Sequence, residues 1–219
     1  MSQLKKNRRA AEILKKLAEH YPDATTALNF SNEFELLVSV VLSAQSTDKQ
    51  VNQVTRELFQ KYRTPEDFAV LAPEELAEEI KGCGLYRNKA VFLVQIAKQL
   101  VSDYNSRVPA NRQQLEALPG VGRKTANVVL SLAFGQDTLA VDTHVHRVAA
   151  RLGLASGKNT LQTEKELLDV IPLLQRKDFH HRLITHGRKL CKARKPLCSS
   201  CFLSDLCPSN PLQPPGSVF

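Results

Sequence analysis

The sequence lacks the features of a membrane or secreted protein. No apolar run approaches the roughly 20 residues that a membrane-spanning helix needs. The first twenty residues alternate basic and apolar side chains, include Glu12 and Glu19, and contain no continuous hydrophobic stretch of a signal peptide. Cysteine is also scarce, since Cys83 is the only one before residue 191. We therefore expect a cytoplasmic protein without a membrane partner, in which thiols stay reduced.

What the sequence does contain is a basic chain long enough to bury a real core. Its 219 residues suit one large domain or two small lobes. The net charge of +8 is uneven: residues 176–195 hold eight basic residues against one acidic, whereas residues 66–79 hold six acidic residues and no basic ones. Such asymmetry is often only a solvated helix surface. Together with a pI of about 9.3 it favours a face for a polyanion such as nucleic acid.

Four cysteines close to the C-terminus follow the spacing C-x6-C-x2-C-x5-C. They are Cys191, Cys198, Cys201 and Cys207. Cysteines this closely spaced in a reducing compartment favour a metal site over disulfides. Four thiolates can bind zinc, although zinc sites usually have two short CxxC knuckles and this chain has one. The spacing also differs from common ferredoxin patterns, so spacing alone leaves zinc and iron–sulfur open.

Helical periodicity runs through most of the chain and no segment alternates like a strand, which predicts an all-α fold. The first helix places Ile13, Leu14 and Leu17 on one stripe. Short helices are expected to begin at Thr64-Pro65 and Ala72-Pro73, where proline occupies the first helical position. The longer helices are expected over residues 5–20, 32–44, 87–101, 125–134, 144–152, 163–171 and 179–190.

A glycine turn at residues 118–122 leads into a basic helix start, Arg123-Lys124. Gly120 and Gly122 permit unusual backbone conformations and close approach of a ligand, and the helix N-terminus beyond them suits a phosphate. The glycine pattern of a dinucleotide fingerprint and a Walker loop are both absent. A similar but shorter glycine pattern, Gly82-Cys-Gly84, precedes a helix that contains Lys89.

Lys124 and Asp142 are the candidate reactive groups. A cation in the first turn of a helix faces a positive dipole end, which would lower the pKa of Lys124 and favour a free, nucleophilic amine. A phosphate contact is an equally good interpretation. Asp142 precedes a helix and follows an apolar segment, so it is either a simple N-cap or a partly buried carboxylate that shuttles a proton or stabilises a sugar cation. His144 and His146 do not converge on one metal.

Taken together, these segments resemble the endonuclease III branch of the base-excision DNA glycosylases. Residues 118–126 look like the helix-hairpin-helix of that family, residues 141–144 like its aspartate segment, and the cysteine spacing like its [4Fe-4S] loop. Residues 42–48 and 84–86 extend the resemblance to about residues 5–207. The resemblance implies a bifunctional DNA N-glycosylase and AP lyase that excises oxidised pyrimidines and carries a [4Fe-4S] cluster.

The resemblance also implies residue roles. Lys124 would attack C1′ of the damaged nucleotide and form a Schiff base, Asp142 would assist base departure, and β-elimination would nick the strand 3′ to the lesion. The four cysteines would be the cluster ligands. Further DNA contacts are expected from Gln45 and Leu85, which would fill the gap left by the flipped base, and from Gly120, Gly122, Arg123, His144, Lys192, Arg194 and Lys195.

The implied architecture is two helical lobes that flank a DNA-binding cleft. A six-helix lobe is expected over residues 26–136, a cluster lobe over residues 1–25 and 137–207, and a flexible tail over residues 208–219. Lys124 and Asp142 are expected to face each other across the cleft. The expected partner is double-stranded DNA with damaged pyrimidines or abasic sites, bound by a monomer associated with a bacterial nucleoid.

Two other functions compete with this one. A monofunctional adenine glycosylase would share the cluster and the aspartate, but Lys124 and the lack of a C-terminal recognition domain argue against it. A non-catalytic DNA-binding module would use the glycine turn for phosphates and would need neither Lys124 nor Asp142.

Overall fold

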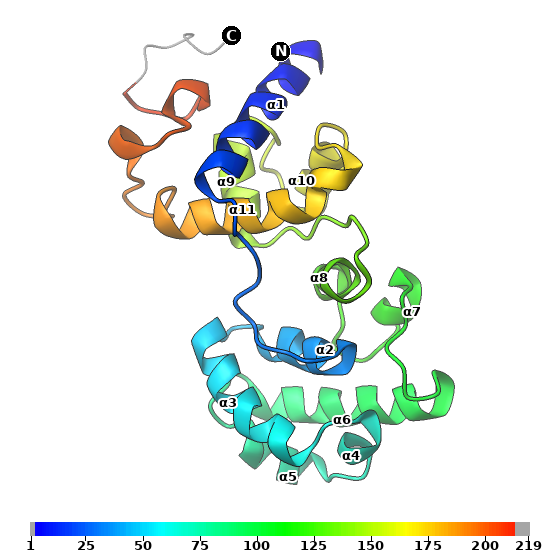
Figure 1. Cartoon of the computed structure of the whole chain (residues 1–219). Coiled ribbons are helices and arrows are strands. Elements are labelled where there is room, and N and C mark those ends of the chain that lie inside the picture. Colours follow the sequence, from blue (N-terminus) through cyan, green and yellow to red (C-terminus); the bar gives the residue numbers. More distant parts are fainter. Residues whose placement is uncertain (1–2, 213–219) are drawn as a thin grey trace. The chain divides into compact units, whose positions relative to one another are not determined.

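The computed structural model describes the backbone of residues 3–212 and the side chains from residue 6 onward. Within this part of the chain every regular element is a helix, and no strand occurs, which confirms the predicted all-α fold. The chain divides into two compact units (Figure 1). We call residues 27–136 the hairpin unit, and the residues up to Thr26 together with those from Asp137 onward the cluster unit. No described helix is long and apolar enough to cross a membrane.

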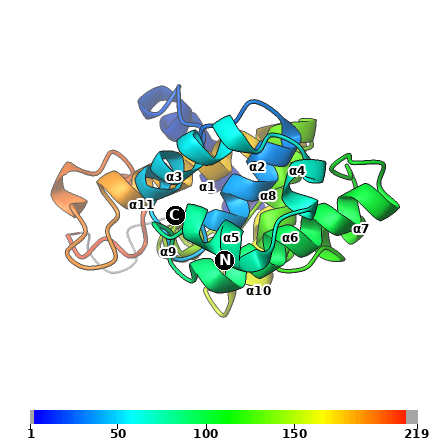
Figure 2. The same cartoon turned by 90° about the horizontal axis from the view of Figure 1, so that it is seen from below.

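The hairpin unit is built around the apolar helix α2. Nine of its ten residues are buried, and it packs on α3, α6 and α8, while α4 and α5 lie along α6 (Figure 2). The seven helices of this unit are α2 (Glu33–Leu42), α3 (Asp48–Lys61), α4 (Pro65–Ala69), α5 (Pro73–Glu79), α6 (Tyr86–Asp103), α7 (Arg112–Glu116) and α8 (Arg123–Phe134). Two of them, α4 and α7, are separately capped helices of only five residues.

Side-chain caps explain where several helices begin. Thr64 and Asp67 form a capping box at α4, where a helix start was predicted, with Pro65 in the first turn. The helix α3 was not predicted, although Thr47 and Gln50 form the same kind of box at its start. The helix α10 spans Thr160–Leu168 rather than residues 163–171, because Asn159 caps it by accepting a hydrogen bond from the Gln162 amide.

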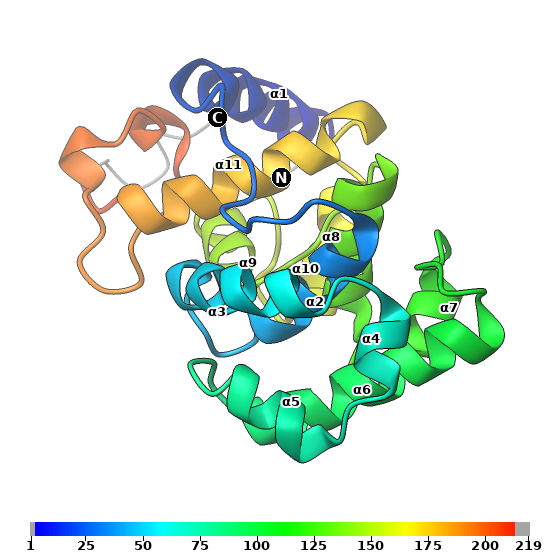
Figure 3. The same ribbon diagram turned by 60° about the horizontal axis from the view of Figure 1, so that its bottom comes forward.

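The cluster unit joins the two ends of the chain. Its main helices are α1 (Gln3–His20), α9 (Thr143–Arg151), α10 and α11 (Arg176–Lys189), and its short 3-10 helices are η1 (Leu173–Gln175), η2 (Cys198–Ser200) and η3 (Ser204–Leu206). The predicted stripe on α1 is buried in the core of this unit. Lys16 of α1 donates hydrogen bonds to the Phe202 carbonyl at 3.1 Å and to Asp205 at 2.8 and 2.9 Å. Figure 3 shows α11 leading into the C-terminal segment that these contacts hold.

The predicted tail at residues 208–219 is described only as far as residue 212, and residues 213–219 lie outside the described part of the chain. Within the described part, Asn210 is buried and donates a hydrogen bond from Nδ2 to the Ser204 carbonyl at 3.2 Å. The first residues of this segment therefore pack on η3.

Candidate functional site

The glycine turn between α7 and α8 presents open backbone. Gly120 has φ +71°, and a Cβ at this position would lie 2.7 Å from the Phe92 ring, so only glycine fits. Gly122 has an ordinary φ of −91°, and a Cβ there would meet nothing within 4 Å. The helix α8 begins at Arg123 with no side-chain cap. Exposed amides at a helix N-terminus suit an anion such as a phosphate.

Lys124 is the second residue of α8 and, like Arg123, is exposed. Its amine therefore lies in the electrostatic field of the helix N-terminus and is open to a ligand approaching the glycine turn. This geometry suits either a nucleophilic amine or a phosphate contact, the two interpretations that the sequence left open.

Asp142 is half-buried and caps α9, as its position in the sequence predicts. Its Oδ1 accepts a hydrogen bond of 2.7 Å from the Val145 amide, and the preceding residues 139–141 are buried. Two residues on, the half-buried His144 lies with its Nδ1 3.2 Å from Nη2 of Arg147. Burial, reinforced by the neighbouring arginines, lowers the pKa of His144, so its ring is neutral at neutral pH. Lys124 and Asp142 belong to different units, and their apposition across a cleft stays a prediction.

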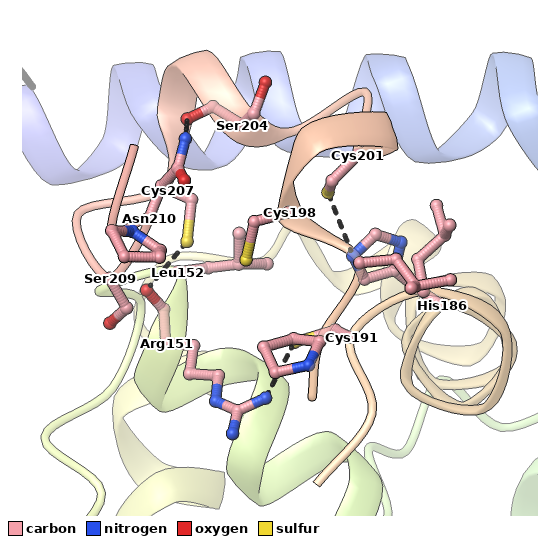
Figure 4. Close-up of a pocket in the computed structure, with 14 residues that line it drawn as sticks. Arg151, Leu152, His186, Cys191, Cys198, Cys201, Ser204, Cys207, Ser209 and Asn210 are labelled. Carbon is pink, nitrogen blue, oxygen red and sulfur yellow. Dashed lines mark hydrogen bonds between the residues drawn. The ribbon is translucent and has the colours of Figure 1, made fainter. Parts of the chain in front are cut away.

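The four clustered cysteines line one cavity of about 230 Å³ (Figure 4). Their sulfurs surround this cavity, and among the described residues no three cysteine, histidine or carboxylate side chains group closely enough to hold a single metal ion. Burial raises the pKa of Cys201 and Cys207, and the neighbouring cysteines raise it further. Thiolates at these positions therefore need a cationic centre, and a set of four cysteines fits a [4Fe-4S] cluster.

Side chains outside the quartet also reach its sulfurs. Arg151 of α9 donates from Nη1 to Sγ of Cys191 at 3.4 Å, and Nε2 of His186 lies 3.7 Å from Sγ of Cys201. The other ring nitrogen of His186 lies 3.3 Å from the Tyr21 hydroxyl. Burial lowers the pKa of His186 to about 4, so its ring is neutral. The sequence did not predict these contacts, because each joins residues that are far apart along the chain.

The loop between Cys191 and Cys198 carries three exposed cations, Lys192, Arg194 and Lys195. Arg151 fixes its start by donating hydrogen bonds to the carbonyls of Lys192 at 2.7 Å and of Ala193 at 3.0 Å. Hydrogen bonds from α9 thus hold the start of the loop, while its cations are exposed to solvent.

Gln45 and Leu85 lie on two turns of the hairpin unit that touch each other. Both side chains are exposed, and both residues adopt a left-handed backbone, with φ of 53° and 55°. Gly84 approaches the first turn so closely that a Cβ would lie 2.5 Å from the Gln45 carbonyl oxygen. The structure thus brings together two residues that the sequence separates by forty positions.

Comparison with known proteins identifies the family. Residues 38–173 match the model of the HhH-GPD superfamily of base excision DNA repair proteins, and residues 191–207 match the iron–sulfur binding domain of endonuclease III. Endonuclease III of Escherichia coli (strain K12) is 51% identical over 196 residues, which are 90% of this chain and 93% of the relative. The chain belongs to the endonuclease III family.

Solved structures agree with this assignment. A non-covalent endonuclease III–DNA complex superimposes with a TM-score of 0.90 at 47% identity and covers 96% of this chain and 97% of its own. A trapped endonuclease III–DNA covalent intermediate gives the same TM-score and identity and covers 96% and 98%. The predicted DNA glycosylase and AP lyase activity in base excision repair is confirmed, as is the [4Fe-4S] cluster. Zinc is thereby excluded as the resident metal.

The two hairpin glycines should respond differently to substitution. Gly120→Ala forces a side chain into a left-handed backbone and against Phe92, so the free energy of unfolding should fall by about 1–2 kcal/mol. Gly122→Ser places a favoured N-cap residue in open space and should preserve stability, but its side chain stands where a phosphate would approach. Urea unfolding and DNA-binding anisotropy measure the two effects. Normal DNA affinity of Gly122→Ser would show that the turn is not a phosphate contact.

Proposed function

We propose that this enzyme acts as a monomer on double-stranded DNA that contains oxidised pyrimidines or abasic sites, with Lys124 as its nucleophile. The observation that carries the proposal is an exposed lysine at the second position of α8, directly after a glycine turn with open space at Gly122. Membership of a family that has a trapped covalent intermediate with DNA supports it. A cytoplasmic, nucleoid-associated location stays a prediction.

The first chemical step is a substitution at the sugar. The nucleophile is the Nζ amine of Lys124, which is exposed at the start of α8. The Nζ lone pair forms a bond to C1′, the N-glycosidic bond breaks, and its electron pair leaves with the base, which takes up a proton. The nitrogen loses a proton, the C1′–O4′ bond breaks and O4′ takes up a proton, which gives a protonated imine between Nζ and C1′. Loss of a proton from C2′ then expels the 3′ phosphate oxygen, which cuts the strand 3′ to the lesion.

Asp142 supports this step electrostatically. The hydrogen bond from the Val145 amide orients the carboxylate, which is half-buried after the buried residues 139–141. A carboxylate in such surroundings stabilises the positive charge that develops on the sugar as the base leaves, and it can pass a proton. We assign Asp142 to both tasks.

The remaining site residues bind the DNA. Gln45 and Leu85 fill the gap left by the flipped base, with Leu85 as an apolar wedge. Phosphates meet the amides of the glycine turn, Arg123 and the neutral ring of His144, while the loop at 192–195 adds three cations. Cys191, Cys198, Cys201 and Cys207 are assigned as the cluster ligands. When bound, the cluster supplies the cationic centre that the buried thiolates need, and the four cysteines then hold the basic loop in place.

Lys124 is tested by borohydride trapping on a duplex with an abasic site. Lys124→Ala and Lys124→Arg should both lose the covalent complex, because neither provides a free amine at neutral pH. Lys124→Arg should still bind the DNA, since it keeps the charge. Lys98→Ala, at another exposed lysine, is the matched control and should trap normally. If either Lys124 variant traps like the parent enzyme, the nucleophile is elsewhere.

Asp142 is tested by separating base excision from binding. Asp142→Asn keeps an N-cap but removes the negative charge, so excision of an oxidised pyrimidine should slow by roughly 100-fold, in the range of lost acid–base catalysis. DNA affinity should change little. Single-turnover excision and anisotropy give the two quantities, and equal losses in both would indicate that Asp142 only supports the structure.

The basic loop is tested by the salt dependence of binding. Lys192→Gln removes one phosphate contact, so the slope of log K against log salt should become shallower by about 0.9. Lys165→Gln, at an exposed lysine of α10, is the control and should leave the slope unchanged. An unchanged slope for Lys192→Gln would place the loop away from the DNA.

A further inference from the structure

Lys89 is a buried lysine in the first part of α6. Its side chain is only 4% exposed, and its ammonium group makes three hydrogen bonds. Nζ donates to the Leu42 carbonyl at 2.7 Å, to the Ala44 carbonyl at 2.5 Å and to the Ser46 hydroxyl at 3.1 Å. Burial lowers the pKa of Lys89, and these acceptors at the C-terminal end of α2 compensate the charge.

Two of the three acceptors, Ala44 and Ser46, lie on the turn that carries Gln45, and the third, Leu42, ends the helix before it. A left-handed backbone at a residue other than glycine costs free energy and persists only where its surroundings hold it. Gln45 lies between two of the residues that Lys89 binds, so the ammonium group fixes the turn on both sides of the strained residue.

The same contacts reach the turn that carries Leu85. The Ser46 hydroxyl, which accepts a hydrogen bond from Lys89, also accepts one from the Gly84 amide at 3.0 Å, and it contacts the buried Cys83 thiol. Gly84 lacks the Cβ that would collide with the Gln45 carbonyl oxygen. One buried ammonium group thus connects the left-handed residue of each turn.

We propose that Lys89 is a positioning residue for base extrusion, which holds Gln45 and Leu85 ready to enter the DNA together. The proposal rests on the proposed function, in which these two side chains fill the gap left by the flipped base. Extruding a paired base costs stacking and pairing free energy. Side chains that are already ordered offset more of this cost than side chains that must be ordered during insertion.

Lys89 is not a second nucleophile. All three of its donors are engaged and its side chain is buried, whereas Lys124 is exposed. Its effect on the reaction must therefore pass through the two turns that it holds.

The test compares two duplexes that carry the same oxidised pyrimidine. In one the lesion is fully paired, and in the other it lies in a short unpaired bubble, from which extrusion costs little. Lys89→Met should slow excision from the paired duplex by roughly 10- to 100-fold, the range expected for loss of hydrogen bonds to a charged group. Excision from the bubble should change far less. Lys98→Met, on the exposed side of the same helix, is the matched control and should behave like the parent enzyme on both duplexes.

A double-mutant cycle tests whether Lys89 acts through the wedge. Leu85→Ala removes the wedge and should show the same preference for the bubble. If Lys89 acts by positioning, Lys89→Met combined with Leu85→Ala should be little worse than Leu85→Ala alone on the paired duplex. The proposal would be overturned if the fold-losses of excision rate of the two single variants multiplied in the double variant. It would also be overturned if Lys89→Met lost the same excision rate on both duplexes.

Ser46→Ala decides the matter if Lys89→Met does not fold. It keeps the lysine but removes the hydroxyl that joins the two turns. Its excision rate should fall selectively on the paired duplex, as for Lys89→Met. An equal loss of rate on both duplexes would overturn the proposal. If Leu85→Ala itself shows no preference for the bubble, the wedge assignment in the proposed function fails. If Leu85→Ala shows it and the Lys89 and Ser46 variants do not, only the role of Lys89 fails.

Discussion

The hydrogen bonds that α9 makes at its two ends are the interactions on which the cluster unit depends. At its start, Asp142 accepts a hydrogen bond from the Val145 amide. In its second half, Arg147 donates to the Cys191 carbonyl at 3.0 and 3.2 Å, and Arg151 donates to the Cys191 sulfur and to the two carbonyls that follow. A single nine-residue helix therefore carries the proposed acid at one end and holds the basic cluster loop at the other.

The hairpin unit uses glycine turns followed by helices for two different purposes. At α8 the turn is open and the lysine beyond it is exposed, which suits chemistry on a bound nucleotide. At α6 the turn at Gly84 is closed against its neighbour and the lysine beyond it, Lys89, is buried. The two segments share only a turn hydrogen bond, from the Cys83 amide to Ile80 and from the Val121 amide to Leu118, because the left-handed residue is Leu85 in one and Gly120 in the other. Burial gives each lysine a different role.

The sequence predicted those features that depend on local chemistry. The capping box at Thr64, the N-cap at Asp142 and the buried stripe of α1 follow from spacing within one or two helical turns. The cysteine quartet is also local, and its spacing together with the family resemblance predicted the cluster. The capping box at Thr47 has the same local spacing and indicates a helix start, although α3 was not predicted.

The remaining features depend on contacts between distant segments. Arg151 reaches Cys191 across forty residues, and Lys89 reaches the turn at Gln45 across more than forty, so no periodicity within the chain could indicate either contact. The left-handed backbone at Gln45 and Leu85 is imposed by such tertiary contacts, since neither residue type favours it. The positioning residues Arg151 and Lys89 could therefore be identified only from the tertiary structure. The candidate reactive residues could be identified from the sequence.

The central claim, that an amine at the start of α8 forms the covalent bond to DNA, is tested most directly by mapping the adduct. The parent enzyme is reduced with borohydride on an abasic duplex, digested with a protease and a nuclease, and sequenced by mass spectrometry. We predict that the sugar remnant is found on Lys124 alone. A remnant on Lys89, on another lysine or on the N-terminal amine, with Lys124 unmodified, would contradict the account.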